Sequence, residues 1–129
     1  MGLNERRKVK ELQDVTFPGR VKEIEEICGT PIPYEVDWES LSDDAGALNY
    51  IDNVSCHRLN MALRMICQDE MGKEAVREGL KVVKLKNVKG KPSAISFQNG
   101  ALEMSCDYAV GAGAIISDGE IRKVLENGL

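Results

Sequence analysis

His57 is the only histidine of the chain, so the acid–base chemistry of an imidazole has a single candidate. It lies in residues 55–70, where apolar residues recur at helical spacing. At roughly 100° per residue, three more polar side chains fall on the same side of this helix: Asn60, Arg64 and Gln68. One interpretation of this strip is a small-ligand site in which Arg64 binds an anion and His57 acts as acid or base. The alternative is the solvent-facing side of an amphipathic helix.

The four cysteines show no spacing typical of a metal site or a disulfide framework: Cys28, Cys56, Cys67 and Cys106. Cys56 directly precedes His57, but successive residues on a helix point about 100° apart, so the imidazole does not face that thiol. Cys56 and Cys67 lie roughly 16 Å apart along one helix, too far for a shared disulfide or zinc ion. We therefore expect four reduced, mostly buried thiols, and we predict no catalytic residue, no metal site and no cofactor.

Two other segments contain residues that can bind anions. Gly111 and Gly113 precede a predicted helix, but the third glycine of a dinucleotide-binding loop and the lysine of a P-loop are missing. Lysines crowd residues 81–91, but no aromatic residues are interleaved to stack on bases. A formal net charge of −4 also disfavours a nucleic-acid partner. We expect a turning loop at 111–113 and a solvated sheet face or edge for the lysines.

Acidic residues gather between positions 35 and 44, close to a strand predicted over residues 32–38. Pro33 cannot donate a ladder hydrogen bond, so this strand is expected at the edge of a sheet. We expect the acidic side chains to be solvated and to complement the lysine-rich segment of another copy. Such a contact across a two-fold axis predicts a homo-oligomer, with a homodimer as the simplest form.

The most specific local signal is the Asn99-Gly100 pair, which favours a two-residue hairpin turn because both central residues need positive φ. A two-residue loop fixes the register, and the predicted pairs are Gln98 with Ala101, Phe97 with Leu102, Ser96 with Glu103, and Ile95 with Met104. One face of this hairpin is apolar and the other is polar. The apolar face must be covered by helices.

Helices are predicted elsewhere from spacing and capping residues. A basic helix over residues 4–15 is expected to be peripheral or frayed, and a firmer one begins at Phe17-Pro18 and ends near Gly29. Ser42 is the predicted N-cap of the next helix, and Ser117 with Glu120 forms a capping box for the last. Met61 and Met65 add a second apolar stripe to the 55–70 helix, which predicts that it is largely buried. Residues 110–116 suit either a loop or a short strand.

Together these elements predict one α+β domain spanning residues 1–129, with two layers and a mainly antiparallel sheet of about four strands covered on one face by helices. No apolar run approaches the roughly 20 residues of a membrane span, and the N-terminus lacks a secretory signal, so we expect a cytoplasmic protein without a membrane partner. The expected function is a small non-catalytic binding or protein-interaction module. The alternative is a small-ligand-binding protein or enzyme with an anion-accepting pocket around His57, Asn60 and Arg64.

Overall fold

The structure, a computed structural model, describes residues 2–41 and 44–129 and contains the predicted hairpin. β3 (Ala94–Gln98) and β4 (Ala101–Cys106) are antiparallel, and their register matches the prediction at all four predicted pairs. Asn99 and Gly100 both have positive φ, 53° and 80°, as a type I′ turn requires. The turn chemistry and the alternation of apolar residues therefore specify this part of the sheet correctly.

The sheet as a whole is mixed, which corrects the predicted mainly antiparallel sheet. β1 (Tyr34–Val36) pairs with β2 (Val82–Asn87) in parallel, and β2 pairs with β4 in parallel. The strand order is β1-β2-β4-β3, so the segment between β2 and β3 connects these two strands without pairing them. Because β3 and β4 form a hairpin, the chain turns back after β3 and β4 lies between β3 and β2. β1 lies at the edge, as Pro33 predicts.

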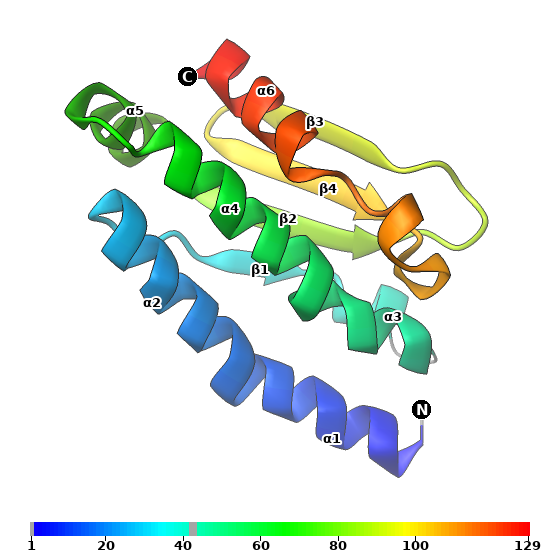
Figure 1. The fold of residues 1–129 in the computed structure, drawn as a ribbon. Helices are drawn as coiled ribbons and strands as arrows, with labels where there is room; N and C mark the ends of the chain where they lie inside the picture. Colours follow the sequence, from blue (N-terminus) through cyan, green and yellow to red (C-terminus); the bar gives the residue numbers. More distant parts are fainter. Residues whose placement is uncertain (1, 42–43) are drawn as a thin grey trace.

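All helices lie on one side of the sheet, which confirms the α+β arrangement of a four-stranded sheet with helices (Figure 1). α1 (Leu3–Glu11) and α2 (Phe17–Cys28) form one continuous rod, although two separate helices were expected. A wider turn of π-helix, Leu12–Thr16, joins them. Pro18 lacks an N–H and its ring crowds the preceding turn, so the wider turn lets the helix continue.

A second rod runs across the middle of the helical layer and consists of α3 (Ala45–Tyr50), a π-helical segment (Ile51–Cys56) and α4 (His57–Ile66). The predicted cap Ser42 lies outside the described residues, and the carboxylate of Asp44 caps α3 by accepting from Ala47 N–H at 3.0 Å. α5 (Glu70–Gly79) and α6 (Asp118–Gly128) complete the layer. Ser117 caps α6 as predicted, accepting from Glu120 N–H at 3.2 Å.

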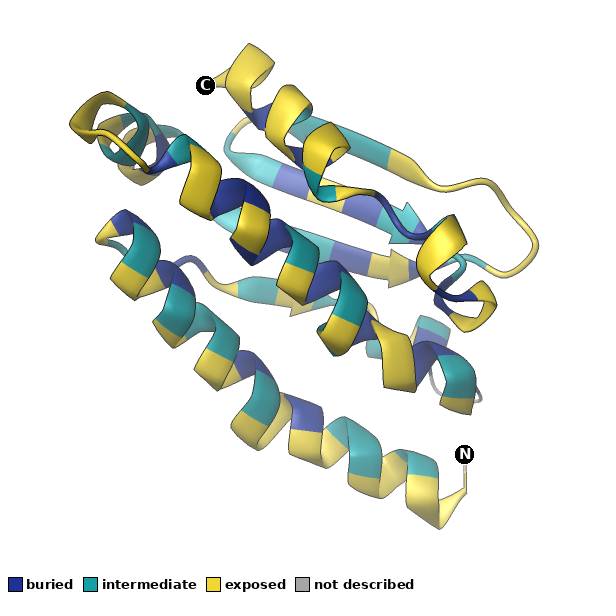
Figure 2. Ribbon diagram, in the orientation of Figure 1, coloured by how far each residue is buried: buried dark blue, intermediate teal, exposed yellow. Residues whose placement is uncertain are grey.

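The core fills the space between the helices and the sheet, as the buried residues of Figure 2 show. Leu59 and Leu63 of α4 are fully buried, together with Leu102 of β4, and α4 packs between α2 and α6. All four cysteines are buried, which confirms that part of the prediction. In the part of the chain that the structure describes, no helix is long and apolar enough to cross a membrane.

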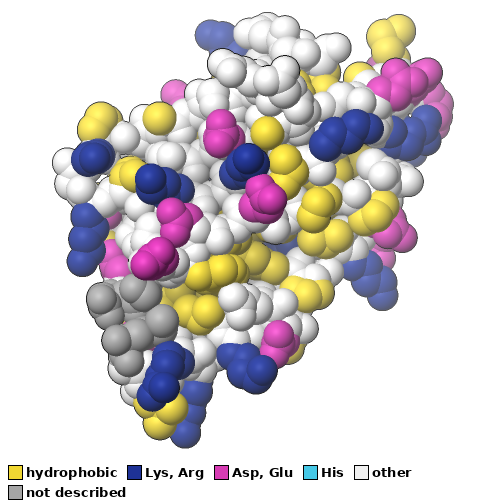
Figure 3. Space-filling model, turned by 180° about the vertical axis from the view of Figure 1, so that it is seen from behind, with side chains coloured by type: hydrophobic (Ala, Val, Ile, Leu, Met, Phe, Trp, Pro, Cys, Tyr) yellow, Lys and Arg dark blue, Asp and Glu magenta, His cyan; other side chains and the backbone are white. Residues whose placement is uncertain are grey.

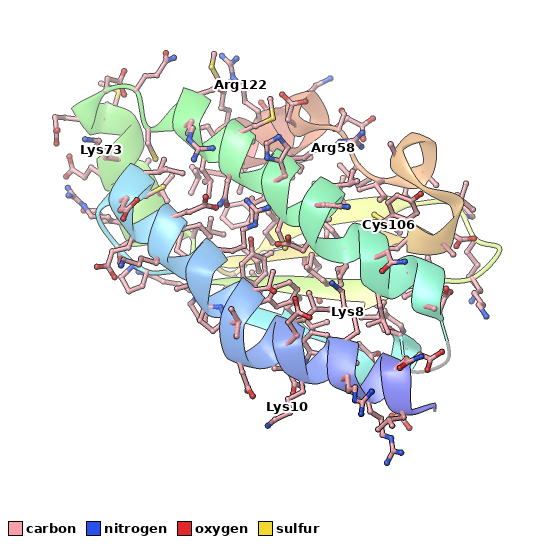
Figure 4. The ribbon with its side chains drawn as sticks, turned by 60° about the horizontal axis from the view of Figure 1, so that its bottom comes forward. Lys8, Lys10, Arg58, Lys73, Cys106 and Arg122 are labelled. Atoms are coloured by element: carbon pink, nitrogen blue, oxygen red, sulfur yellow. The ribbon has the colours of Figure 1, made fainter. Side chains whose placement is uncertain are left out.

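The ambiguous segment before α6 is a loop with two short 3₁₀ turns, Tyr108–Val110 and Ala112–Ala114. Arg58 of α4 reaches over to this loop (Figure 4). Its guanidinium donates hydrogen bonds to the backbone carbonyls of Ala112, Ile115 and Ile116, at 3.1, 2.7 and 3.5 Å. The glycine-containing loop is therefore attached to the central helix.

Candidate functional site

The predicted strip on the 55–70 helix does not present its four side chains to a common space. Asn60 is fully buried, whereas His57, Arg64 and Gln68 are exposed. Asn60 points toward α2, where its side-chain amide donates to the carboxylate of Glu23 at 2.8 Å. Arg64 contributes electrostatically to the same carboxylate, so Asn60 and Arg64 share one neighbourhood.

This neighbourhood is a polar network between the two rods of helix. Arg20 of α2 donates to Glu23 at 2.9 Å and to Asp52 at 2.7 Å. Asp52 belongs to the second rod, so Arg20 ties the two rods together close to the sheet edge. No sequence motif marks Arg20, Glu23 and Asp52 as a group. The i,i+3 spacing of Arg20 and Glu23 is a local signal, but Asp52 is 32 residues away and only the fold brings it close.

The charges of this network stabilise one another. The pKa of Arg20 is raised above its ordinary value, chiefly by the hydrogen bond to Asp52, and this outweighs the opposing effect of burial. Burial alone would raise the pKa of Glu23, but the hydrogen bonds and charges of Arg20, Asn60 and Arg64 lower it. The carboxylates of Glu23 and Asp52 thus already accept the hydrogen bonds that Arg20 and Asn60 could otherwise donate to a bound anion.

Glu23→Gln is expected to flatten the loss of stability in acid. Because the folded-state pKa of Glu23 lies below its ordinary value of 4.5, its contribution is complete above pH 4.5 and is lost as the pH falls through the folded-state pKa. Urea unfolding between pH 7 and pH 3 should show a shallower fall for the variant. Glu25→Gln, an exposed carboxylate on the same helix, should keep the wild-type slope. Identical slopes for all three proteins would contradict this prediction.

The thiols are poor nucleophiles in this environment. Burial raises the pKa of Cys56 to about 12, and it also raises the pKa of Cys28, Cys67 and Cys106. The Cys67 thiol contacts the Cys28 thiol with 3.0 Å between the sulfur atoms, which joins the ends of α2 and α4. Across the described residues, no group of three or more His, Cys, Asp or Glu side chains is arranged to hold a metal ion.

A different feature is the largest of the clefts described here, at the end of the helical layer where α4, α5 and α6 meet. It has a volume of about 530 Å³. Its apolar lining comes from α4, from α5 and from the residue that follows α6: Met65, Ile66, Met71, Ala75 and Leu129. Its polar lining is Gln68, Asp69, Arg122 and Glu126. Of the predicted site residues, Gln68 therefore borders this cleft.

The turn between α4 and α5 builds this cleft. Asp69 caps α5, since its carboxylate accepts from Gly72 N–H at 2.7 Å. Gly72 lies so close to the end of α4 that an added Cβ would be 1.7 Å from the carbonyl oxygen of Ile66. The missing side chain at Gly72 lets α5 begin directly beside α4, and this places Met71 opposite Met65.

Several exposed apolar side chains lie in or near this cleft: Met65, Met71 and Leu129 line it, and Met61 lies one helical turn before Met65. Met61, Met65, Met71 and Leu129 are 40%, 43%, 80% and 37% exposed. They are four of the eight large hydrophobic side chains that are exposed among the described residues. The expectation that Met61 and Met65 help to bury the 55–70 helix is wrong, because both side chains are exposed to solvent.

Two further surfaces lie toward the sheet. A cleft of about 280 Å³ between α2 and β1 is lined by aromatic residues, with Phe17 stacked on Tyr34 at 5.1 Å between ring centroids and Trp38 beside them. Figure 3, seen from the sheet side, shows hydrophobic side chains gathered among scattered charges. On the open sheet face, Lys84 pairs with Glu35 at 3.6 Å. The acidic and basic segments, expected to meet between two copies, thus meet within one chain at this pair.

The geometry defines the class of molecule as a two-layer α+β protein with a mixed four-stranded sheet and an exposed methionine-lined cleft. Comparison of the chain with protein-family models, with curated proteins and with solved structures finds no match to any of them.

Proposed function

We propose that this protein is a non-catalytic protein-interaction module, and that it binds an apolar anchor of a partner in the cleft between α4, α5 and α6. The observation that carries the proposal is that three exposed apolar side chains, Met65, Met71 and Leu129, line one cleft. Scattered exposed apolar residues are ordinary on a protein surface, whereas a contiguous group marks an interaction site.

The chemistry of the lining supports a protein partner. Methionine side chains are unbranched and polarizable, so they adapt to differently shaped apolar groups. Polar residues surround the methionines, including Gln68 and the Arg122–Glu126 ion pair at 2.6 Å. An apolar centre with a polar rim is the usual arrangement of a protein–protein interface.

The anion-accepting pocket around His57, Asn60 and Arg64 stays a prediction with less support. The buried amide of Asn60 already donates to Glu23, and an anion placed there would meet the negative charges of Glu23 and Asp52. His57 and Arg64 are exposed, and neither lines any of the clefts named above.

A peptide-display selection against the immobilised protein tests the proposal. We expect enrichment of peptides with apolar anchors, and we expect Met65→Gln with Met71→Gln to weaken their binding about tenfold or more. Val15→Gln with Val110→Gln is the matched control, because it removes two apolar side chains exposed elsewhere. If no peptide is enriched, or if both double variants weaken binding equally, the cleft is not an interaction site.

A further inference from the structure

The methionine-lined cleft continues into a second, shallower one along α5. The second cleft has a volume of about 330 Å³ and shares Met71, Ala75 and Leu129 with the first. Together they form one groove between α5 and α6, which we call the α5 groove. Its apolar floor therefore extends along a helix instead of ending in a single pocket.

The charges that line the α5 groove are mostly of one sign. Its carboxylates are Asp69, Glu74, Glu78 and Glu126, and its single cation is Arg122. Arg122 is neutralised by Glu126 at 2.6 Å. Glu74 and Glu78 are exposed, and neither has an ion-pair partner within the described part of the chain. The α5 groove is therefore electronegative as well as apolar.

The cations of α5 lie away from the groove. Lys73 lies toward α2, where its charge acts on the Cys28 thiol, and it pairs weakly with Glu70 at 3.9 Å (Figure 4). The guanidinium of Arg77 lies 3.6 Å from the position of a Cβ on Gly29, at the end of α2. The acidic and basic residues of α5 are thus segregated, with the acidic ones on the α5 groove.

We propose that the occupant of the α5 groove is a basic amphipathic helix from another protein. Its apolar side chains would contact Met65, Met71 and Leu129, and its lysines or arginines would face Glu74 and Glu78. This inference rests on the proposed function and adds the chemistry of the partner. A helix fits because the groove is bounded by helix side chains, as in other grooves that bind amphipathic helices.

A second copy of this chain is a less suitable occupant. Its most basic helix is α1, with Arg6, Arg7, Lys8 and Lys10. The apolar residues Val9 and Leu12, however, pack into the core of their own chain. α1 therefore offers positive charge to a second copy, but Leu3 is its one exposed large apolar side chain, and the groove requires several.

Three synthetic peptides test the inference with the intact protein. Each has about 15 residues, long enough to form a helix on binding. The first has leucines at helical spacing among lysines, the second has glutamates in place of the lysines, and the third has the composition of the first in scrambled order. We expect the lysine peptide to bind about tenfold or more tightly than the others at low salt, and to weaken as salt rises from about 0.01 M to 1 M.

Methyl NMR of the methionines locates the binding. The signals of Met65 and Met71 should shift with the lysine peptide, while Met104, buried in the core, should not. Glu74→Lys with Glu78→Lys should reverse the preference, so that the glutamate peptide becomes the tighter ligand. Glu11→Lys with Glu103→Lys makes the same change in net charge at exposed positions elsewhere and should leave the preference unchanged.

The outcomes separate this inference from the proposed function. If the lysine and glutamate peptides bind equally, and both bind less well to the Met65→Gln, Met71→Gln protein, the basic partner is wrong and the interaction module stands. If no peptide binds and no methionine signal shifts, both proposals fail. If the protein associates with itself, and Glu74→Lys with Glu78→Lys abolishes that association, the occupant is a second copy.

Discussion

Asn87→Leu is expected to lower the free energy of unfolding by about 3 kcal/mol or more. The Asn87 side chain is buried at the end of β2 and makes three hydrogen bonds: it donates to the Ser40 carbonyl at 3.0 Å and to the Asp44 carboxylate at 3.3 Å, and accepts from Tyr108 N–H at 3.2 Å. Leucine has a similar volume but no polar atoms. The substitution therefore leaves two buried groups and the half-buried Ser40 carbonyl without this partner, and each unmade buried bond costs about 1–3 kcal/mol.

Chemical denaturation of the two proteins measures this difference, and amide hydrogen exchange at Tyr108 reports on the lost bond directly. Asn53→Leu is the control, because Asn53 is exposed on the second rod of helix. Its effect is expected to stay within about 0.5 kcal/mol. If Asn87→Leu lowered the free energy of unfolding no more than this control does, the bonds of Asn87 to Ser40, Asp44 and Tyr108 would not stabilise the fold.

Gly72→Ala is expected to destabilise the protein by about 2–3 kcal/mol, although alanine is the better helix former. The added Cβ would lie 1.7 Å from the backbone oxygen of Ile66, and a backbone atom cannot turn aside as a flexible side chain can. Either α5 or the end of α4 must move. Met71 is adjacent to Gly72, so the shape of the α5 groove should change as well.

Gly19→Ala on α2 is expected to have the opposite effect on stability, because nothing lies within 4 Å of a Cβ built at Gly19. There, helix propensity should act alone and stabilise the protein by about 0.5–1 kcal/mol. The pair is measured by urea denaturation, with circular dichroism to verify the helix content. A stabilising effect of both substitutions would show that α5 does not depend on a close approach to α4.

The features that could be predicted from the sequence are those determined by neighbouring residues. The Asn99-Gly100 turn and the Ser117 cap are each specified within a few positions, and both are present. The sheet order could not be predicted in this way, because the parallel pairing of β2 with β4 depends on competition among strands for one position. Hydrophobic periodicity shows which strand faces are apolar but does not show which strands are neighbours.

The same distinction applies to the candidate site. The helical strip predicts Asn60 as a ligand-binding residue beside His57 and Arg64, but it contains no sign of Glu23, the hydrogen-bond partner of Asn60 that lies 37 positions away. The sequence predicts Met61 and Met65 as core residues, because hydrophobic periodicity shows that a helix face is apolar but not whether that face is buried. Whether an apolar stripe is covered depends on whether another element packs over it, and Met61 and Met65 stay exposed in this fold.

The strand order also has a kinetic consequence for folding. The β3–β4 hairpin needs only a two-residue loop, so its formation requires little loss of chain entropy. Pairing of Tyr34 with Val83 must close a loop of about 50 residues, which makes it entropically the most expensive contact of the sheet. Until β2 arrives, one edge of β4 is unpaired, and that edge includes the apolar Leu102 and Met104. β4 lies between β2 and β3 in the folded sheet, but during folding one of its edges is exposed. At that stage β4 is most open to pairing with another chain.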